Sequence, residues 1–327
     1  MRSIFETPQQ DRFFILMPPV LALLVAFAFI ENSAGYLWLL LGVSVFDSGH
    51  VYITGWRTWW NAGLAQKPAA FYLVPALVFI AMFFWNYLSI PFLWTFVVYF
   101  TVYHNVRQLY GIGKWFQVVE KNFNKAADYF LYAVCAVSFL ALHFRTDFKY
   151  DYYTGHDLFS YPNQPLFLSL QIVALLLFVL YLSYEYFLYK KSGEVFLNRV
   201  LFYASGMAVY LASCLWATNA LQLLAPLILT HALHYLALVV LTGGKTNPWL
   251  KTGLFKVTGV VLGSLLLFGL LEYYLEEEYI DIFSHSIIGS IVVALYLVPL
   301  LTHFILDSII WKSSYPEFRD FLKSKHG

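Results

Sequence analysis

Apolar runs of membrane-spanning length occupy most of this chain and leave little room for any other fold. Ten such runs of about 20 residues, separated by short polar segments, are each long enough to cross a bilayer as a helix. Only 12% of the residues are charged, about half of the ~25% found in soluble domains. Because lipid offers no partner to backbone polar groups, such runs form helices. The sequence predicts an all-α, polytopic transmembrane helix bundle.

The predicted spans cover nearly the whole chain, so we expect residues 1–327 to form a single integral-membrane helical domain. A short cytoplasmic N-terminal segment, 1–12, precedes the first span, and a cytoplasmic C-terminal tail, 312–327, follows the last one. We place the ten spans at 13–30, 35–53, 69–88, 91–110, 127–144, 165–189, 198–217, 219–241, 253–275 and 283–311.

The distribution of lysine and arginine supports this span count. Short cytoplasmic loops of membrane proteins carry an excess of basic residues. If ten helices alternate in direction from a cytoplasmic N-terminus, 18 of the 20 basic residues lie inside, and only Arg145 and Lys149 lie outside. We therefore expect both termini in the cytoplasm of a multi-pass protein, with the bacterial inner membrane as its location. The net charge of +1 argues against a nucleic-acid partner.

Five histidines lie within the predicted spans, all on helices that run toward the cytoplasm. Each is close to the cytoplasmic end of its span, about 6 to 18 Å from the inner boundary at 1.5 Å per residue. They form one layer and are contributed by the second, fourth, eighth and tenth spans. These histidines are His50, His104, His231, His234 and His303.

Other polar residues occur one helical turn from these histidines and so share their helix faces. Asp47 precedes His50 by three residues, Asp307 follows His303 by four, and Gln108 follows His104 by four, beside Arg107. His231 and His234 are themselves three residues apart. Polar groups are costly inside a membrane, so each needs a partner or a function.

Metal ligation is the chemistry that best accounts for this array. Imidazole and carboxylate ligands suit iron, zinc, copper or manganese, and helix bundles build such sites from several helices. Either two metals are bound, or one metal takes about four histidines while the aspartates orient the imidazoles. A proton or ion relay is an alternative. Haem fits less well because the HxxH pair turns both imidazoles to one side, whereas bis-histidine haem needs opposed ligands.

One further segment, "KWFQVVEKNFNKAADYF", begins after the fourth predicted span. It places Trp115, Val119 and Phe123 on one helix face, with lysines on the other side. This pattern predicts an amphipathic helix that lies at the inner membrane interface.

The motifs resemble a known family. "FDSGH", a later histidine on the second span after it, and a paired-histidine helix "HALHY" resemble the Brp/Blh family of integral-membrane carotene-cleaving oxygenases. The resemblance implies one iron held by histidines from separate helices, with ligand roles for His50, His104, His231 and His234. The chain is also similar, more broadly, to histidine-rich membrane desaturases and hydroxylases.

The sequence therefore favours a membrane metalloenzyme, a non-haem iron oxygenase that acts on a lipophilic substrate such as a carotenoid or lipid. It would bind one or two iron ions, or zinc in their place, and use O2 and an electron donor. His303 is a fifth or second-metal ligand, Asp47 and Asp307 are ligands or acceptors, and Gln108 and Arg107 position the substrate or an oxygen-derived ligand. A zinc-dependent membrane lipid hydrolase and a proton or cation relay transporter are the alternatives.

Overall fold

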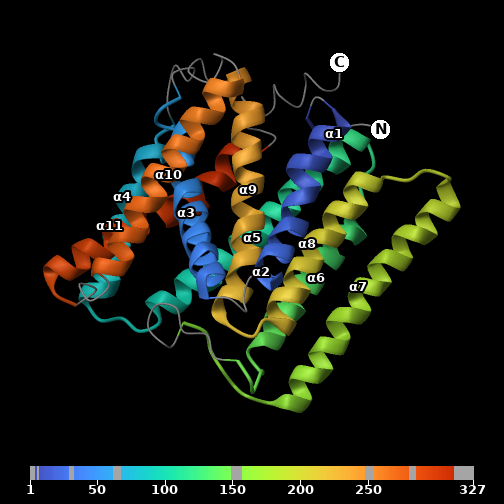
Figure 1. The fold of residues 1–327 in the computed structure, drawn as a ribbon, viewed down its shortest axis with the longest axis horizontal. Helices are drawn as coiled ribbons and strands as arrows, with labels where there is room; N and C mark the ends of the chain where they lie inside the picture. Colours follow the sequence, from blue (N-terminus) through green and yellow to red (C-terminus); the bar gives the residue numbers. More distant parts are fainter. Residues whose placement is uncertain are drawn as a thin grey trace. The chain divides into compact units, whose positions relative to one another are not determined.

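The described part of the chain is entirely helical (Figure 1). A computed structural model describes residues 4–5, 7–28, 33–61, 68–148, 157–246, 254–279 and 285–312. The predicted C-terminal tail beyond residue 312 lies outside the described residues, as do positions 1–3 and 6 of the N-terminal segment.

Each of the ten predicted spans coincides with helical structure. The first span corresponds to three consecutive pieces, and every other span corresponds to one helix. The elements are α1 (Pro8–Asp11), the π-helical η1 (Arg12–Leu16), α2 (Met17–Ala28), α3 (Ser33–Arg57), α4 (Ala70–Tyr87), α5 (Leu93–Glu120), α6 (Lys125–Leu142), α7 (Gln164–Ser192), α8 (Leu197–Trp216), α9 (Ala220–Thr246), α10 (Leu254–Tyr279) and α11 (Ile287–Ile310).

Seven helical segments of the described chain are long and apolar enough to cross a membrane, which indicates an integral membrane protein. The segments that meet this criterion include the continuous stretch Pro8–Ala28 and all of α7. Ten crossings, and the cytoplasmic placement of both termini, therefore stay predictions.

The predicted interfacial helix after the fourth span is wrong. Helix α5 continues without a break to Glu120, and Trp115 and Val119 are buried, with 6% and 7% of their surface exposed. Gly111 and Gly113 do not end the helix, because burial of its apolar residues outweighs the weak helix propensity of glycine. Phe123 is 70% exposed and lies in the short connection to α6. The amphipathic pattern thus reflects packing inside the protein.

Several helix ends are fixed by local hydrogen bonds. Asn124, Asn163 and Ser286 cap the starts of α6, α7 and α11, and each side chain accepts a hydrogen bond from a backbone N–H in the first turn. Gly193 ends α7 in the left-handed conformation with φ of 71°, which glycine adopts without a steric penalty. The sequence thus encodes sharp boundaries around the longest apolar helix.

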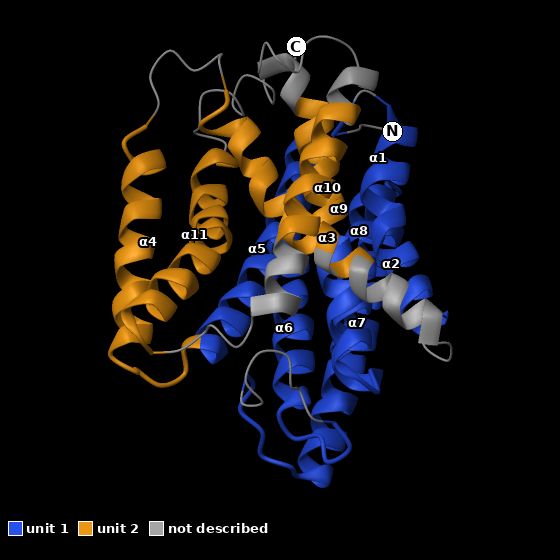
Figure 2. Ribbon diagram, turned by 60° about the vertical axis from the view of Figure 1, so that its left-hand side comes forward, with its two compact units in different colours: residues 1–40, 94–231 blue, residues 41–93, 232–327 orange. Residues whose placement is uncertain are grey.

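The chain divides into two compact units, residues 1–40 with 94–231 and residues 41–93 with 232–327 (Figure 2). In unit 1, α6 packs against α7 and α8, and α8 also contacts η1 and α2. In unit 2, α11 packs along α4. That residues 1–327 form a single domain stays a prediction.

A second core in unit 2 joins α3, α9 and α10. Its buried members are Val45, Ile53, Tyr235, Val239, Val261 and Leu265. Glycines allow α3 and α10 to approach closely within this core. A Cβ atom on Gly49 would lie 2.6 Å from the Leu265 carbonyl oxygen, and one on Gly269 would lie 2.5 Å from that of Val45. The glycine of "FDSGH" therefore has a structural role in helix packing.

We expect Gly49→Ala to destabilise unit 2, because backbone atoms of α10 must move to admit the new methyl group. Overpacking of this kind costs roughly 1–3 kcal/mol. Gly42→Ala on the same helix is the matched control, since a Cβ there meets nothing within 4 Å, and should be neutral or slightly stabilising. The measurement is the midpoint of thermal unfolding in detergent. Equal midpoints for the two variants would refute the close-packing role.

Candidate metal centre

His50 is fixed in unit 2 by the helix that carries it. Its side chain on α3 is 1% exposed, and its Nδ1 lies 2.8 Å from the carbonyl oxygen of Phe46, one turn earlier. A carbonyl oxygen only accepts hydrogen bonds, so Nδ1 carries the proton and Nε2 carries the lone pair. The sequence pattern F-x-x-x-H on α3 thus leaves Nε2 as the nitrogen that is able to bind a metal.

His303 on α11 packs edge to face against His50. Their ring centroids are 5.0 Å apart with an interplanar angle of 85°, and His303 is 1% exposed. The Nδ1 of His303 lies 2.6 Å from the hydroxyl of Thr54, which lies 2.7 Å from the hydroxyl of Tyr235. Side chains from α3, α9 and α11 therefore hold this imidazole in one orientation.

Asp307 completes the group around His303. It follows His303 by one helical turn, is 7% exposed, and places Oδ1 3.6 Å from His303 Nδ1. A carboxylate and a hydroxyl next to one ring nitrogen direct the other nitrogen away from them. This is how metal-binding histidines are usually oriented, by acceptors on the nitrogen that does not ligate.

Unit 1 contains a second pair of buried imidazoles. His104 on α5 and His231 on α9 are 7% and 4% exposed, and their ring centroids lie 4.8 Å apart at 74°. The boundary between the units falls within α9, directly after His231, so His231 and His234 belong to different units but to one continuous helix. Whether the two imidazole pairs form one site, as the sequence predicts, stays a prediction.

The structure separates the predicted ligands into two sets. Five are buried and lie next to another predicted ligand of the same unit, namely His50, His303 and Asp307 in unit 2 and His104 and His231 in unit 1. Within the part of the chain that the structure describes, His234 and Asp47 belong to no group of possible metal ligands. His234 is nevertheless fully buried, and Asp47 is partly buried.

Gln108 and Arg107, predicted to position the substrate, point to different surroundings. Both polar atoms of the Gln108 side chain are buried and have no hydrogen-bond partner among the described residues. Arg107 is exposed, donates to the Tyr132 hydroxyl at 2.7 Å and stacks over the Tyr110 ring. Gln108 thus has an unused hydrogen-bonding group one turn from His104, whereas Arg107 lies on the side of α5 that meets α6.

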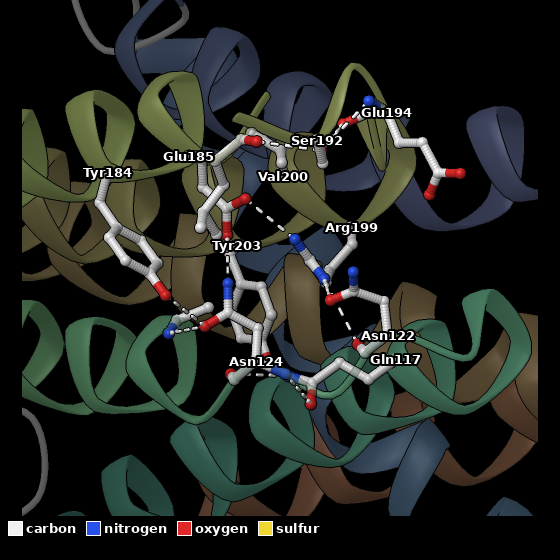
Figure 3. A network of polar contacts seen from close by, with 12 residues as sticks. Gln117, Asn122, Asn124, Tyr184, Glu185, Ser192, Glu194, Arg199, Val200 and Tyr203 are labelled. Carbon is white, nitrogen blue, oxygen red and sulfur yellow. Dashed lines mark hydrogen bonds and ion pairs between the residues drawn. The ribbon is translucent and has the colours of Figure 1, made fainter. Parts of the chain in front are cut away.

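Sequence reasoning missed a buried polar network elsewhere in unit 1, which Figure 3 shows. Glu185 on α7 accepts hydrogen bonds from Arg199 on α8 at 2.9 Å and from the Asn124 amide at 3.0 Å. Arg199 also donates to Asn122 Oδ1 at 2.9 Å. Glu185 lies four residues before the end of its predicted span. Arg199 entered the sequence-based prediction only as one of the basic residues on the cytoplasmic side. Glu185 and Arg199 flank the short connection between α7 and α8, and this closeness in the sequence could have indicated an ion pair.

Glu120 ends α5 near this network and lies ten residues beyond the predicted span. It is 9% exposed. Burial raises its pKa to about 7, although the charge of Arg199 acts in the opposite direction. The neighbouring carboxylates of Glu185 and Asp11 also raise the pKa. Glu120 is therefore a group that titrates near neutral pH within a buried network.

No known protein family, curated protein or solved structure matches this chain. The resemblance to the Brp/Blh oxygenases therefore stays a prediction from short motifs.

The raised pKa of Glu120 predicts how stability depends on pH. Its pKa is higher in the folded chain, about 7, than its ordinary value of 4.5, so the folded state binds the proton more tightly. The stabilisation is complete below pH ~4.5 and is lost as pH rises through 7, at most ~1.4 kcal/mol per unit of pKa difference. We expect the thermal unfolding midpoint to fall across this range.

Glu120→Gln should flatten that pH profile, because glutamine does not titrate. Glu194→Gln, which changes an exposed glutamate in the α7–α8 connection, is the charge-matched control and should keep the slope of the wild type. A wild-type slope in Glu120→Gln would show that other groups cause the pH dependence.

Proposed function

We propose that this protein is an integral-membrane metalloenzyme of the bacterial inner membrane, a non-haem iron oxygenase that acts on a lipophilic substrate such as a carotenoid or lipid. One observation carries the proposal. His50 and His303, buried on different helices, have ring centroids 5.0 Å apart, and the Nδ1 of each lies within hydrogen-bond distance of an oxygen, the Phe46 carbonyl or the Thr54 hydroxyl. Imidazoles with this orientation present Nε2 as a ligand atom.

Packing alone is a weaker account of this geometry. An imidazole used only for packing needs a hydrogen-bond partner, and Phe46 and Thr54 already supply one each. Burying two imidazoles side by side costs hydration free energy, and a shared metal ion would offset that cost for both rings. The His104–His231 pair of unit 1 follows the same logic.

The ligands we propose are His50, His104, His231 and His303, with Asp307 as a ligand or as the acceptor that orients His303. His234 and Asp47 become weaker candidates because they join no group of possible ligands in the described chain. Iron bound by histidine and carboxylate with open positions supplies oxygen activation, with electrons from a separate donor. These ligands would hold one or two iron ions.

The chain itself would contribute binding and exclusion of water. Apolar helix surfaces admit a lipophilic substrate from the bilayer and keep the site dry, which strengthens electrostatic interactions there. The Gln108 amide, which has no hydrogen-bond partner among the described residues, lies one turn from His104 and can donate to or accept from a polar group of the substrate. Arg107, which contacts Tyr132 instead, is less suited to that role.

A zinc-dependent lipid hydrolase is the second candidate, and the position of Asp307 favours it. A buried carboxylate 3.6 Å from a possible metal-binding imidazole can act as the general base toward a metal-bound water. The two candidates share their ligands and differ in the metal and in the need for O2. Metal identity therefore distinguishes them.

We expect His303→Ala to lose most of its bound metal, while His234→Ala loses much less. Both changes remove a buried imidazole from a helix and leave a good helix former, so His234→Ala is the matched control for a general effect of burial. The measurement is metal per folded, monodisperse protein by elemental analysis. Iron in the wild type supports the oxygenase, and zinc supports the hydrolase.

Two outcomes would contradict the proposal. If the wild type holds no transition metal after anaerobic reconstitution with iron, zinc and manganese in turn, the metalloenzyme is excluded. A proton relay through Thr54, Tyr235 and His303 would then be the better account. If His303→Ala keeps a full complement of metal, the ligand set is wrong.

Thr54→Val should weaken metal binding without abolishing it. Valine keeps the shape of threonine but removes the hydroxyl next to His303 Nδ1, and loss of such orienting partners typically costs 10- to 100-fold in metal affinity. Thr54→Ser keeps the hydroxyl and should restore most of the affinity. Competition with a chelator measures the difference. Equal affinities for the valine and serine variants would show that Thr54 does not orient the ligand.

A further inference from the structure

Helices α5 and α6 of unit 1 flank a surface recess that is separate from the candidate metal centre. Its volume is about 470 Å³, and it is lined by three basic side chains, Arg107, Lys114 and Lys125, one carboxylate, Asp128, and four tyrosines. The recess thus combines an excess of positive charge with aromatic walls.

The single carboxylate in the recess is already fully engaged. Lys114 forms an ion pair with Asp128, and the Asp128 Oδ1 atom accepts hydrogen bonds from Tyr203 at 2.6 Å and from Gln117 at 2.8 Å. Asp128 therefore compensates one of the three cations and has little capacity left for the other two.

Arg107 and Lys125 keep their charges without a carboxylate partner among the residues that the structure describes. Arg107 donates to the neutral Tyr132 hydroxyl at 2.7 Å, and its guanidinium lies 4.9 Å from the centre of the Tyr110 ring. Stacking covers one face of the guanidinium and leaves its in-plane N–H groups available. In-plane N–H pairs are the groups that bind phosphate oxygens bidentately.

The recess lies at the end of a predicted membrane span. Lys125 is the first residue of α6, which is apolar enough to cross the bilayer. Two of the tyrosines, Tyr103 and Tyr129, are 58% and 72% exposed. Tyrosines concentrate at headgroup level, and basic pockets between helices on the cytoplasmic side bind lipid headgroups.

A larger groove of about 930 Å³ runs beside the network of Figure 3, but its excess of positive charge is smaller, since Lys125, Lys191 and Arg199 share it with the carboxylates of Glu185 and Glu194. Arg199 pairs there with Glu185, and Glu194 lies in the same groove as Lys191. The smaller recess is therefore the better site for an anion.

We propose that the α5–α6 recess binds the phosphate of an anionic phospholipid in the cytoplasmic leaflet. Arg107 and Lys125 contact the phosphate oxygens, and the tyrosines pack against the glycerol and the start of the acyl chains. Basic residues near an anionic membrane surface each contribute about fivefold to tenfold in affinity. Because the recess opens beside exposed tyrosines, a membrane lipid fits it better than a soluble phosphate.

The test is native mass spectrometry of the full chain in detergent, titrated with phosphatidylglycerol or phosphatidylcholine of identical acyl chains. We expect the wild type to bind phosphatidylglycerol about tenfold more tightly. The double variant Arg107→Gln with Lys125→Gln should bind both lipids equally. Lys190→Gln with Lys191→Gln, on the last turn of α7, removes the same charge outside the recess and should keep the preference.

Tyr132→Phe keeps both charges but removes the hydroxyl that accepts a hydrogen bond from Arg107. This variant tests the recess if the double variant does not fold. A loss of about threefold in phosphatidylglycerol affinity, with phosphatidylcholine unchanged, supports the site. The proposal is overturned if the wild type shows no preference, if the α7 control loses it equally, or if Tyr132→Phe binds like the wild type. Displacement of the lipid by inorganic phosphate would show that the recess binds a soluble anion and not a lipid.

Discussion

The cost of removing polar groups from water governs every feature described above. In an apolar helix bundle a buried charge or hydrogen-bonding group must find a partner within the protein. Glu185 and Arg199 meet this requirement by pairing with each other and with side-chain amides of the α5–α6 connection. Removing either partner leaves an uncompensated charge, so such a network fixes how α7 and α8 are joined.

Close packing and the pairing of polar groups together explain the local order of residues on α3. Gly49 removes a side chain where α10 approaches, and the next residue, His50, bonds back to Phe46 within its own helix. Thr54, one turn later, contacts both His303 and Tyr235. The stretch from Phe46 to Thr54 thus supplies a packing contact, an imidazole and the group that orients a second imidazole. Gly49 and His50 are neighbours with separable roles.

The positions of the helices could be predicted from the sequence because they depend on run length and local capping alone. The directions of the polar side chains could not. Arg107 follows His104 by three residues, yet it stacks on Tyr110 and contacts Tyr132. The extension of α5 to Glu120 depends on burial of Trp115 and Val119. These outcomes require knowledge of neighbouring helices, which no single-helix pattern contains.

For the candidate site, too, the sequence indicated the positions of residues along the helices but not their partners. Helix depth and one-turn spacing brought out the histidines and Asp307, but Thr54 and Tyr235 carry no sequence signal of their own, since threonine and tyrosine are common in apolar helices. His234 shows that spacing alone does not identify a ligand. It lies three residues from His231, but it joins no group of possible ligands in the described chain. Spacing on one helix constrains which residues share a face. It does not determine what that face meets.

A bound molecule can satisfy a buried polar group that the protein leaves unpaired. In the structural network of unit 1, both carboxylate oxygens of Glu185 accept hydrogen bonds within the protein. The Gln108 amide is equally inaccessible but has no partner among the described residues, and such a group costs roughly 1–3 kcal/mol. A structural role for Gln108 would leave that cost without compensation, since an apolar residue of similar size would fill the same space. A polar group of a bound molecule would remove the free-energy cost of the unpaired amide. Because Gln108 lies one turn from His104, it is the residue that most directly connects the proposed metal centre to a substrate.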